Sequence, residues 1–129
     1  MVASLATPGD AGRRILVVED ELMIRMLLED MLSDLGYTVA AEAGRIDEAM
    51  PLAHTAEVDA AILDLNLNGQ SVLPVAEVLA GRGVPLIFAT GYGERGLPET
   101  YRGRPTLQKP FEQQSLDRAL NQVFTGPQG

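Results

Sequence analysis

The chain has 129 residues, of which 46% are hydrophobic and 22% charged, enough for one domain with a buried core. It carries 18 acidic and 10 basic residues. The formal net charge of −8 argues against a nucleic-acid partner, because binding phosphates requires clustered lysine and arginine. The absence of cysteine excludes disulfides, thiolate metal sites and a cysteine nucleophile. No apolar run reaches the roughly 18 residues of a membrane span, so we expect no membrane partner and a cytoplasmic location.

The two ends of the chain are predicted to lie outside the folded domain. Residues 1–13 contain neither a basic start nor a long apolar stretch, so we expect a disordered leader rather than a signal peptide. Residues 14–124 contain the periodic patterns of a single folded domain. Residues 125–129 are expected to form a frayed tail.

The first half of the chain alternates strand and helix patterns. In order, we predict a strand over residues 15–18, a helix over 21–35, a strand over 38–43 and a helix over 46–53. The first strand is a short aliphatic run, typical of a strand buried on both faces. Gly36 suits the C-terminal end of the first helix, and Pro51 weakens or shifts the second.

The second half continues the alternation with one exception. In order, we predict a strand over residues 60–64, a loop over 65–69, a helix over 71–80, strands over 85–90 and 106–108, and a last helix from 111 to 123 or 124. Gly69 marks the loop, and Ser71 can cap the helix that follows. Residues 91–105 contain four glycines and two prolines without a helical period, so we expect a mobile or only partly helical segment there.

This alternation predicts an α/β fold. Five strands separated by helical patterns imply right-handed crossovers, a doubly wound parallel sheet and helices on both of its faces. In such a sheet, the residues that follow the carboxyl ends of the strands meet at one crevice.

Four charged residues occupy such positions. Glu19 and Asp20 follow the first strand, Asp64 closes the third, and Lys109 follows the fifth. Clustering these charges would be costly unless something binds them. Three acids and one lysine indicate that a divalent cation and an anion bind at this crevice. A phosphoryl group on Asp64 would be compatible with both.

At this point the chain resembles a known family, the response-regulator receiver domains of two-component signalling. The motifs that carry the resemblance are the acidic pair Glu19-Asp20, Asp64 after the third strand, Thr90 after the fourth, and Lys109-Pro110 after the fifth. Residues 88–93 further resemble the signature of the FATGUY subgroup, whose members are mostly stand-alone receivers. The resemblance implies a flavodoxin-like strand order 2-1-3-4-5.

The resemblance also implies a role for each site residue. Asp64 would accept a phosphoryl group from the phosphohistidine of a sensor histidine kinase. Mg²⁺ would be bound by Asp20, Asp64 and the backbone carbonyl of Asn66, with Glu19 contributing through water. The Lys109 side chain would pair with phosphoryl oxygens.

Further roles follow from the same resemblance. The Thr90 hydroxyl would donate a hydrogen bond to the bound phosphoryl group, and Pro110 would be structural. Such a protein would signal through contacts with a downstream protein, or act as a phosphate sink or shuttle that exchanges phosphoryl groups with a histidine phosphotransferase. The surface around the fourth and fifth strands and the last helix is the expected output surface.

The chain departs from the family at residue 106. Receivers usually carry Tyr or Phe three residues before the lysine, whereas this chain has Thr106, which cannot bury a ring. We therefore expect residues 91–105 to be the bistable element, with Tyr92 or Tyr101 supplying the missing aromatic ring.

Several of these residues, and some others, also allow a simpler interpretation. Each acid considered singly could be a helix cap or a solvated charge, and Lys109 alone a surface lysine. His54 is expected to be a spectator rather than a phosphotransfer histidine. Met23, Met26 and Met31 are expected to fill the core rather than to form a partner groove.

Three rival functions make different demands on the sequence. A degenerate receiver should lack Asp20, Asp64 or Lys109, and all three are present. An aspartyl-phosphate hydrolase would place an acid two residues after the nucleophile, where this chain has Asn66. A flavin-binding protein of this fold would need a phosphate loop after the first strand, and Glu19-Asp20-Glu21 would repel the phosphate. The phosphoacceptor interpretation is therefore preferred.

Overall fold

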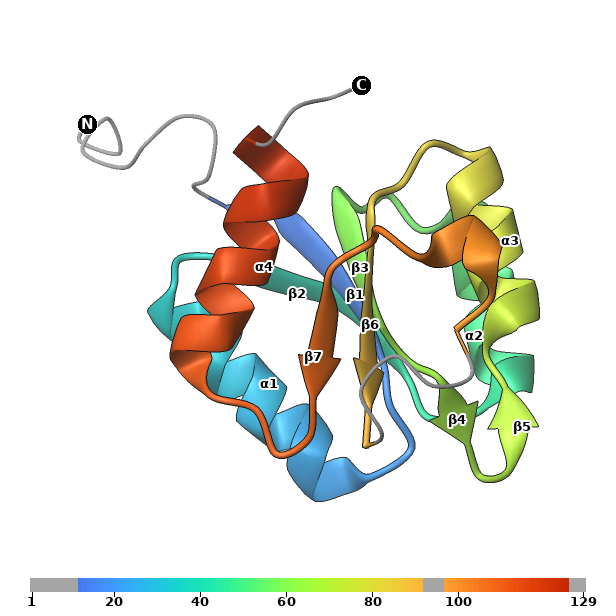
Figure 1. Ribbon diagram of the computed structural model, residues 1–129, viewed down its shortest axis with the longest axis horizontal. Coiled ribbons are helices and arrows are strands. Elements are labelled where there is room, and N and C mark those ends of the chain that lie inside the picture. The colour runs from blue at the N-terminus through green and yellow to red at the C-terminus, as the bar shows by residue number, and fades with distance from the viewer. Residues whose placement is uncertain (1–11, 92–96, 126–129) are drawn as a thin grey trace.

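The sheet is five-stranded, parallel and central to the molecule (Figure 1). The computed structural model describes residues 12–91 and 97–125. In chain order, the sheet strands are β1 (Arg14–Val18), β2 (Thr38–Ala43), β3 (Ala60–Asp64), β6 (Leu86–Thr90) and β7 (Thr106–Gln108). They lie side by side in the order β2-β1-β3-β6-β7, which confirms the predicted flavodoxin-like topology.

Two pairs of helices cover the two faces of the sheet (Figure 1). One face packs against α1 (Leu22–Asp34) and α4 (Gln113–Thr125), and the other packs against α2 (Ile46–Thr55) and α3 (Leu73–Gly81). The central strands β3 and β6 are buried at every residue, as their aliphatic runs predict for strands covered on both sides. Two separate apolar cores result, one on each face.

The register of the sheet aligns the carboxyl ends of its central strands. Asp64 pairs with Ala89, and Thr90 pairs with Gln108 in the next strand. The Lys109 N–H donates to the Thr90 carbonyl at 2.9 Å, so the chain leaving β7 stays attached to the end of β6. This register brings the candidate residues to one edge of the sheet.

The segment after β3 differs from the predicted loop. It contains a two-stranded antiparallel hairpin, β4 (Asn66–Leu67) and β5 (Gln70–Ser71). The prediction that Ser71 begins the next helix was therefore wrong by two residues, since Ser71 ends the hairpin and α3 begins at Leu73. The Ser71 hydroxyl still accepts a hydrogen bond from the Leu73 N–H at 3.1 Å.

The Gly-rich segment is only partly helical in its described part, as predicted. Residues 97–105 contain one turn of 3-10 helix, η2 (Glu99–Tyr101), and Tyr92 lies outside the described residues. The predicted disordered leader and frayed tail also fall mostly on residues outside the described ranges. Within the described chain, no helix combines the length and the apolar character required to cross a membrane.

The methionines of α1 correct a prediction. Met23 is 82% exposed and Met26 is 54% exposed, so neither fills the core, whereas Met31 does pack against it. Leu22 and Leu27 are also exposed. The helix buries Leu28 and Leu32 instead and presents a strip of apolar side chains to solvent.

Candidate functional site

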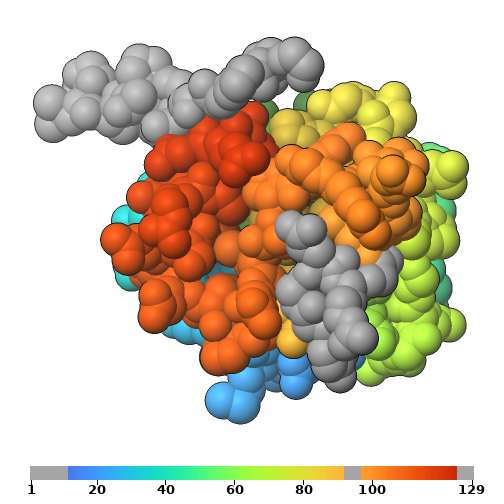
Figure 2. Space-filling view, viewed as in Figure 1, coloured from blue at the N-terminus to red at the C-terminus, as the bar shows by residue number. Residues whose placement is uncertain are grey.

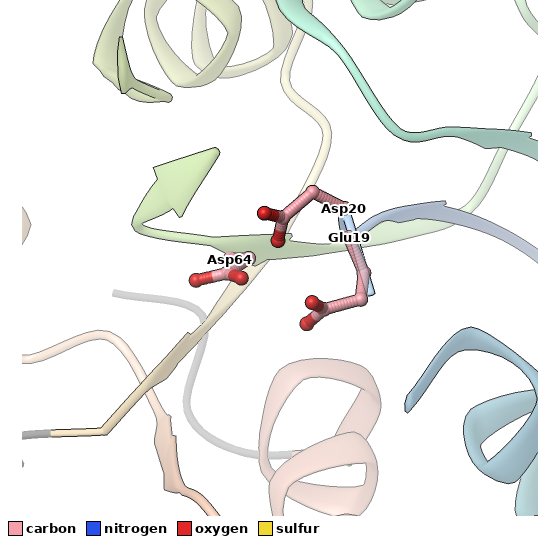
Figure 3. A group of neighbouring side chains, drawn as sticks. All are labelled: Glu19, Asp20 and Asp64. Atoms are coloured by element: carbon pink, nitrogen blue, oxygen red, sulfur yellow. The ribbon is translucent and has the colours of Figure 1, made fainter. Parts of the chain in front are cut away.

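Three carboxylates meet at the carboxyl edge of the sheet (Figure 3). Glu19 and Asp20 follow β1, and Asp64 is the last residue of β3. One oxygen of each carboxylate lies within 4.8 Å of an oxygen of the other two. Asp64 and Glu19 are buried, and Asp20 is half-buried. The side chains therefore converge as the strand-end positions predict.

Lys109 lies between the two buried carboxylates. Its ammonium nitrogen is 2.8 Å from Asp64 Oδ2 and 2.9 Å from Glu19 Oε1. Burial lowers the pKa of Lys109, but the hydrogen bonds to Asp64 and Glu19 outweigh it, so the pKa lies above its usual value. The lysine is therefore charged and compensates part of the negative charge of the site.

Glu19 is the carboxylate most affected by its surroundings. Burial raises the pKa of Glu19 to about 7, against the opposing hydrogen bond from Lys109. Its other oxygen, Oε2, accepts the Glu21 N–H at 3.0 Å. A carboxyl with a pKa near neutrality has a strong tendency to gain either a proton or a cation, and a cation bound beside it would restore its ionised form.

The donor set fits a hard divalent cation. The three side chains offer only carboxylate oxygens, which are the ligands that Mg²⁺ prefers, and one of them is partly accessible from solvent. The Asn66 residue, whose carbonyl was predicted as a further ligand, lies two residues beyond Asp64, and its N–H donates to Asp64 Oδ1 at 3.1 Å. These residues could hold Mg²⁺.

The other residues singled out from the sequence lie at several positions around the carboxylates and beyond them. Thr90 is buried at the end of β6, and Pro110 follows Lys109 through a cis peptide bond. Thr106 is half-buried in β7. Tyr101 packs against Phe88 with 5.4 Å between ring centroids. His54 is exposed on α2, which is separate in the chain from every strand end that forms the site.

The sequence interpretation overlooked Asn68. Its N–H donates to Asp20 Oδ2 at 3.1 Å, which links the hairpin to a carboxylate that lies 48 residues earlier in the chain. The dipeptide Asn68-Gly69 is the strongest short-range signal for a hairpin, and it was available in the sequence.

Comparisons with known proteins agree with this arrangement. Residues 15–121 match the family model of the response regulator receiver domain. The chain is 34% identical over 120 residues to the transcriptional regulatory protein PdtaR of Mycobacterium tuberculosis, an alignment that covers 88% of this chain and 58% of PdtaR. This chain thus corresponds to little more than half the length of that relative.

Solved structures of similar proteins cover nearly the whole domain. The solution structure of SdrG from Sphingomonas melonis Fr1 has a TM-score of 0.78 at 40% identity and covers 89% of this chain and 97% of SdrG. The receiver domain of the sensor histidine kinase PA1611 from Pseudomonas aeruginosa PAO1, described with a magnesium ion in its active site cleft, has a TM-score of 0.74 at 28% identity. That alignment covers 88% of this chain and 98% of the PA1611 chain.

Proposed function

Because the chain belongs to the response-regulator receiver domain family of two-component systems, we propose that it accepts a phosphoryl group from a sensor histidine kinase on Asp64. The observation that carries the proposal is the position of the Asp64 carboxylate, which lies beside two further acids and 2.8 Å from the Lys109 ammonium. The similarity to SdrG agrees with the FATGUY-like residues 88–93.

In the proposed reaction, an oxygen of Asp64 attacks the phosphorus of a phosphohistidine. The phosphorus–nitrogen bond breaks, and its electron pair stays on an imidazole whose second nitrogen carries a proton, so the ring leaves neutral. Phosphoryl transfer passes through a loose transition state and depends chiefly on positioning and electrostatic stabilisation. In this proposal Lys109 moves from the Asp64 oxygen to a phosphoryl oxygen, and the Thr90 hydroxyl donates to another.

Magnesium is the proposed cofactor. Asp20, Asp64 and the Asn66 carbonyl would bind it directly, and Glu19 would bind it through water. When bound, the ion would neutralise negative charge on the phosphoryl oxygens. Lys109 contacts both Glu19 and Asp64, so it offsets part of their negative charge while no cation is bound.

The test is phosphotransfer from a panel of labelled histidine kinases to the wild type and to Asp64→Ala. We expect label on the wild type and none on the variant. Asp59→Ala is a matched control, because Asp59 is an exposed acid just before the amino end of the same strand, and it should accept label as the wild type does. Transfer that survives Asp64→Ala would refute the assignment. Passage of the label from the phosphorylated wild type to a histidine phosphotransferase would identify a shuttle rather than an end point.

The proposed kinase-docking surface is the beginning of α1. Figure 2 shows these first turns, in blue, at the lower edge of the molecule. Leu22, Met23, Met26 and Leu27 are the large hydrophobic side chains exposed among the described residues. A phosphohistidine that reaches Asp64 would bring the surrounding surface of the kinase close to this strip, because α1 begins two residues after Asp20. Apolar side chains in such a contact would be removed from water.

The proposed response to phosphorylation runs through Tyr101. Its ring contacts Phe88, which lies two residues before Thr90 on the same strand and therefore faces the same side of the sheet. The Arg104 guanidinium lies 5.6 Å from the Tyr101 ring centroid. A shift of Thr90 towards a phosphoryl group would disturb the end of β6 and thereby the Phe88–Tyr101 contact.

Amide hydrogen exchange with and without beryllofluoride tests this response. We expect altered protection over residues 97–105 in the wild type and a smaller change in Tyr101→Ala. Tyr37→Ala is the matched control, because the Tyr37 ring stacks on a different ring, Phe124, with a centroid distance of 5.9 Å. This variant should show the same change over residues 97–105 as the wild type. Identical protection in both states would exclude this route for the signal.

A further inference from the structure

The hairpin after β3 has a two-residue tip with an unusual backbone. Asn68 has φ +52° and Gly69 has φ +83°, so both tip residues are in the left-handed region, as in a type I′ turn. The flanking residues Leu67 and Gln70 pair directly across the hairpin. Asparagine and glycine are the residues that tolerate this conformation best, and it aligns with the natural twist of two antiparallel strands.

The hairpin is fixed to the domain at its base. The Leu67 side chain is only 1% exposed and belongs to the core between the sheet, α2 and α3. The Val72 N–H donates to the Leu65 carbonyl at 3.2 Å, which closes the chain below the hairpin. The tip is therefore held in a defined position relative to the end of β3.

From this position the hairpin makes hydrogen bonds to the proposed metal ligands. The Asn68 N–H donates to Asp20 Oδ2 at 3.1 Å, and the Asn66 N–H donates to Asp64 Oδ1 at 3.1 Å. The Gly69 N–H donates to the Asn66 side-chain oxygen at 2.7 Å, which ties the tip back to the residue whose carbonyl is the third proposed ligand. One small element thus connects groups that come from β1 and β3.

The bond to Asp20 has a specific consequence. The Asp20 side chain is half-buried, and its carboxylate lies beside that of Asp64 (Figure 3). With one oxygen held by a backbone N–H, the carboxylate loses the freedom to rotate away, and its second oxygen stays available for a cation. Partners that orient a ligand in this way typically change metal affinity by about 10- to 100-fold when they are removed.

We propose that the β4–β5 hairpin positions Asp20 for Mg²⁺, and that the left-handed backbone of Asn68 and Gly69 is the feature that makes this possible. Asn68 is then a positioning residue that acts through its N–H rather than through its side chain. This inference rests on the proposed magnesium site, but it does not require that Asp64 be phosphorylated.

The experiment uses two glycines with nearly the same backbone. Gly69 has φ +83° and Gly83 has φ +80°, and an added Cβ would meet no atom within 4 Å at either position. Gly69→Val and Gly83→Val should therefore introduce similar strain, one at the hairpin tip and the other in the loop between α3 and β6. Isothermal titration calorimetry with MgCl₂ measures the affinity, and urea denaturation measures the stability of each variant.

We expect Gly69→Val to weaken Mg²⁺ binding by about tenfold or more, and Gly83→Val to leave it within twofold of the wild type. Asn68→Gly keeps both the left-handed backbone and the N–H, so it should also bind within about threefold of the wild type. If a valine variant does not fold, the Gly69→Ala and Gly83→Ala pair should show the same difference with a smaller size.

Two results would overturn the proposal in different ways. Equal Mg²⁺ affinity in Gly69→Val and Gly83→Val would show that the hairpin does not position Asp20, while the proposed phosphoacceptor could still stand. A wild-type protein that binds no Mg²⁺ would remove the metal from the proposed function and this inference with it.

Discussion

Replacing Lys109 by methionine should destabilise the domain in a manner that depends on pH. Methionine keeps an unbranched side chain of similar length and removes the ammonium group that lies 2.8 Å from Asp64 and 2.9 Å from Glu19. Those carboxyl groups are almost fully buried, and removing the partner of a buried ion pair costs about 3–5 kcal/mol. Because the Lys109 side chain is itself 18% exposed, we expect the lower end, about 3 kcal/mol at pH 8.

The direction of the pH dependence follows from Glu19. Its pKa in the folded protein is already raised to about 7, chiefly by burial, and loss of Lys109 raises it further. A raised carboxyl pKa contributes stability that is lost as the pH increases through the folded value. The destabilisation of Lys109→Met relative to the wild type should therefore be small near pH 5.5 and largest at pH 8.

Urea denaturation at pH 5.5, 7 and 8, with and without 10 mM MgCl₂, is the assay. Bound Mg²⁺ replaces the lost positive charge, so it should restore more stability to Lys109→Met than to the wild type. The variant should also bind Mg²⁺ about fivefold more tightly, since a competing cation has been removed. The same loss of stability at all three pH values, together with an unchanged response to MgCl₂, would refute this reasoning.

Three further outcomes are expected. Burial and a hydrogen bond with Glu29 raise the pKa of Glu42 to about 7, so the free energy of unfolding should fall by about 1 kcal/mol between pH 5 and 8 through this partly exposed group. Glu42→Gln should flatten that part of the pH dependence, and parallel stability curves for the variant and the wild type would exclude this contribution of Glu42. Met23→Gln should slow phosphorylation by the cognate kinase about fivefold and leave phosphorylation by acetyl phosphate unchanged, whereas an equal effect on both donors would argue against kinase docking on α1. Leu28→Ala should lower the free energy of unfolding by about 2–5 kcal/mol because the side chain is fully buried. Leu22→Ala on the exposed strip should change it by no more than about 0.5 kcal/mol, and equal losses of stability in the two variants would contradict the orientation of α1.

The residues of the candidate site could be located from the sequence because each one is defined by the end of a strand. Glu19 and Asp64 stand at the ends of aliphatic runs that end abruptly in a charge, and a parallel sheet brings such positions together whatever the lengths of its helices. Thr106 is recognised as a departure only through the resemblance to receiver domains, which usually carry Tyr or Phe three residues before the lysine. The chemical roles of these residues remain proposals that the phosphotransfer and metal titrations test.

The hairpin was missed for a different reason. Its strands have two residues each, too few for any alternation of apolar and polar side chains to be seen. Only the Asn68-Gly69 dipeptide predicts the turn, and it was interpreted as a loop ending. The hydrogen bond from Asn68 to Asp20 spans 48 residues and depends on the packing of Leu67, so no local pattern contains it.

The apolar strip of α1 marks the limit of periodicity as a guide. The helix repeats apolar residues so densely that two different faces could be buried, one containing Leu28 and Leu32 and another containing Met23 and Met26. The choice depends on the rotation of the helix about its axis, and that rotation is set by the sheet, by Tyr37 and by the contact with α4 rather than by α1 itself. The proposed kinase contact on α1 would account for the methionines there, and comparison of kinase and acetyl phosphate as donors to Met23→Gln separates that explanation from simple tolerance of exposed apolar side chains.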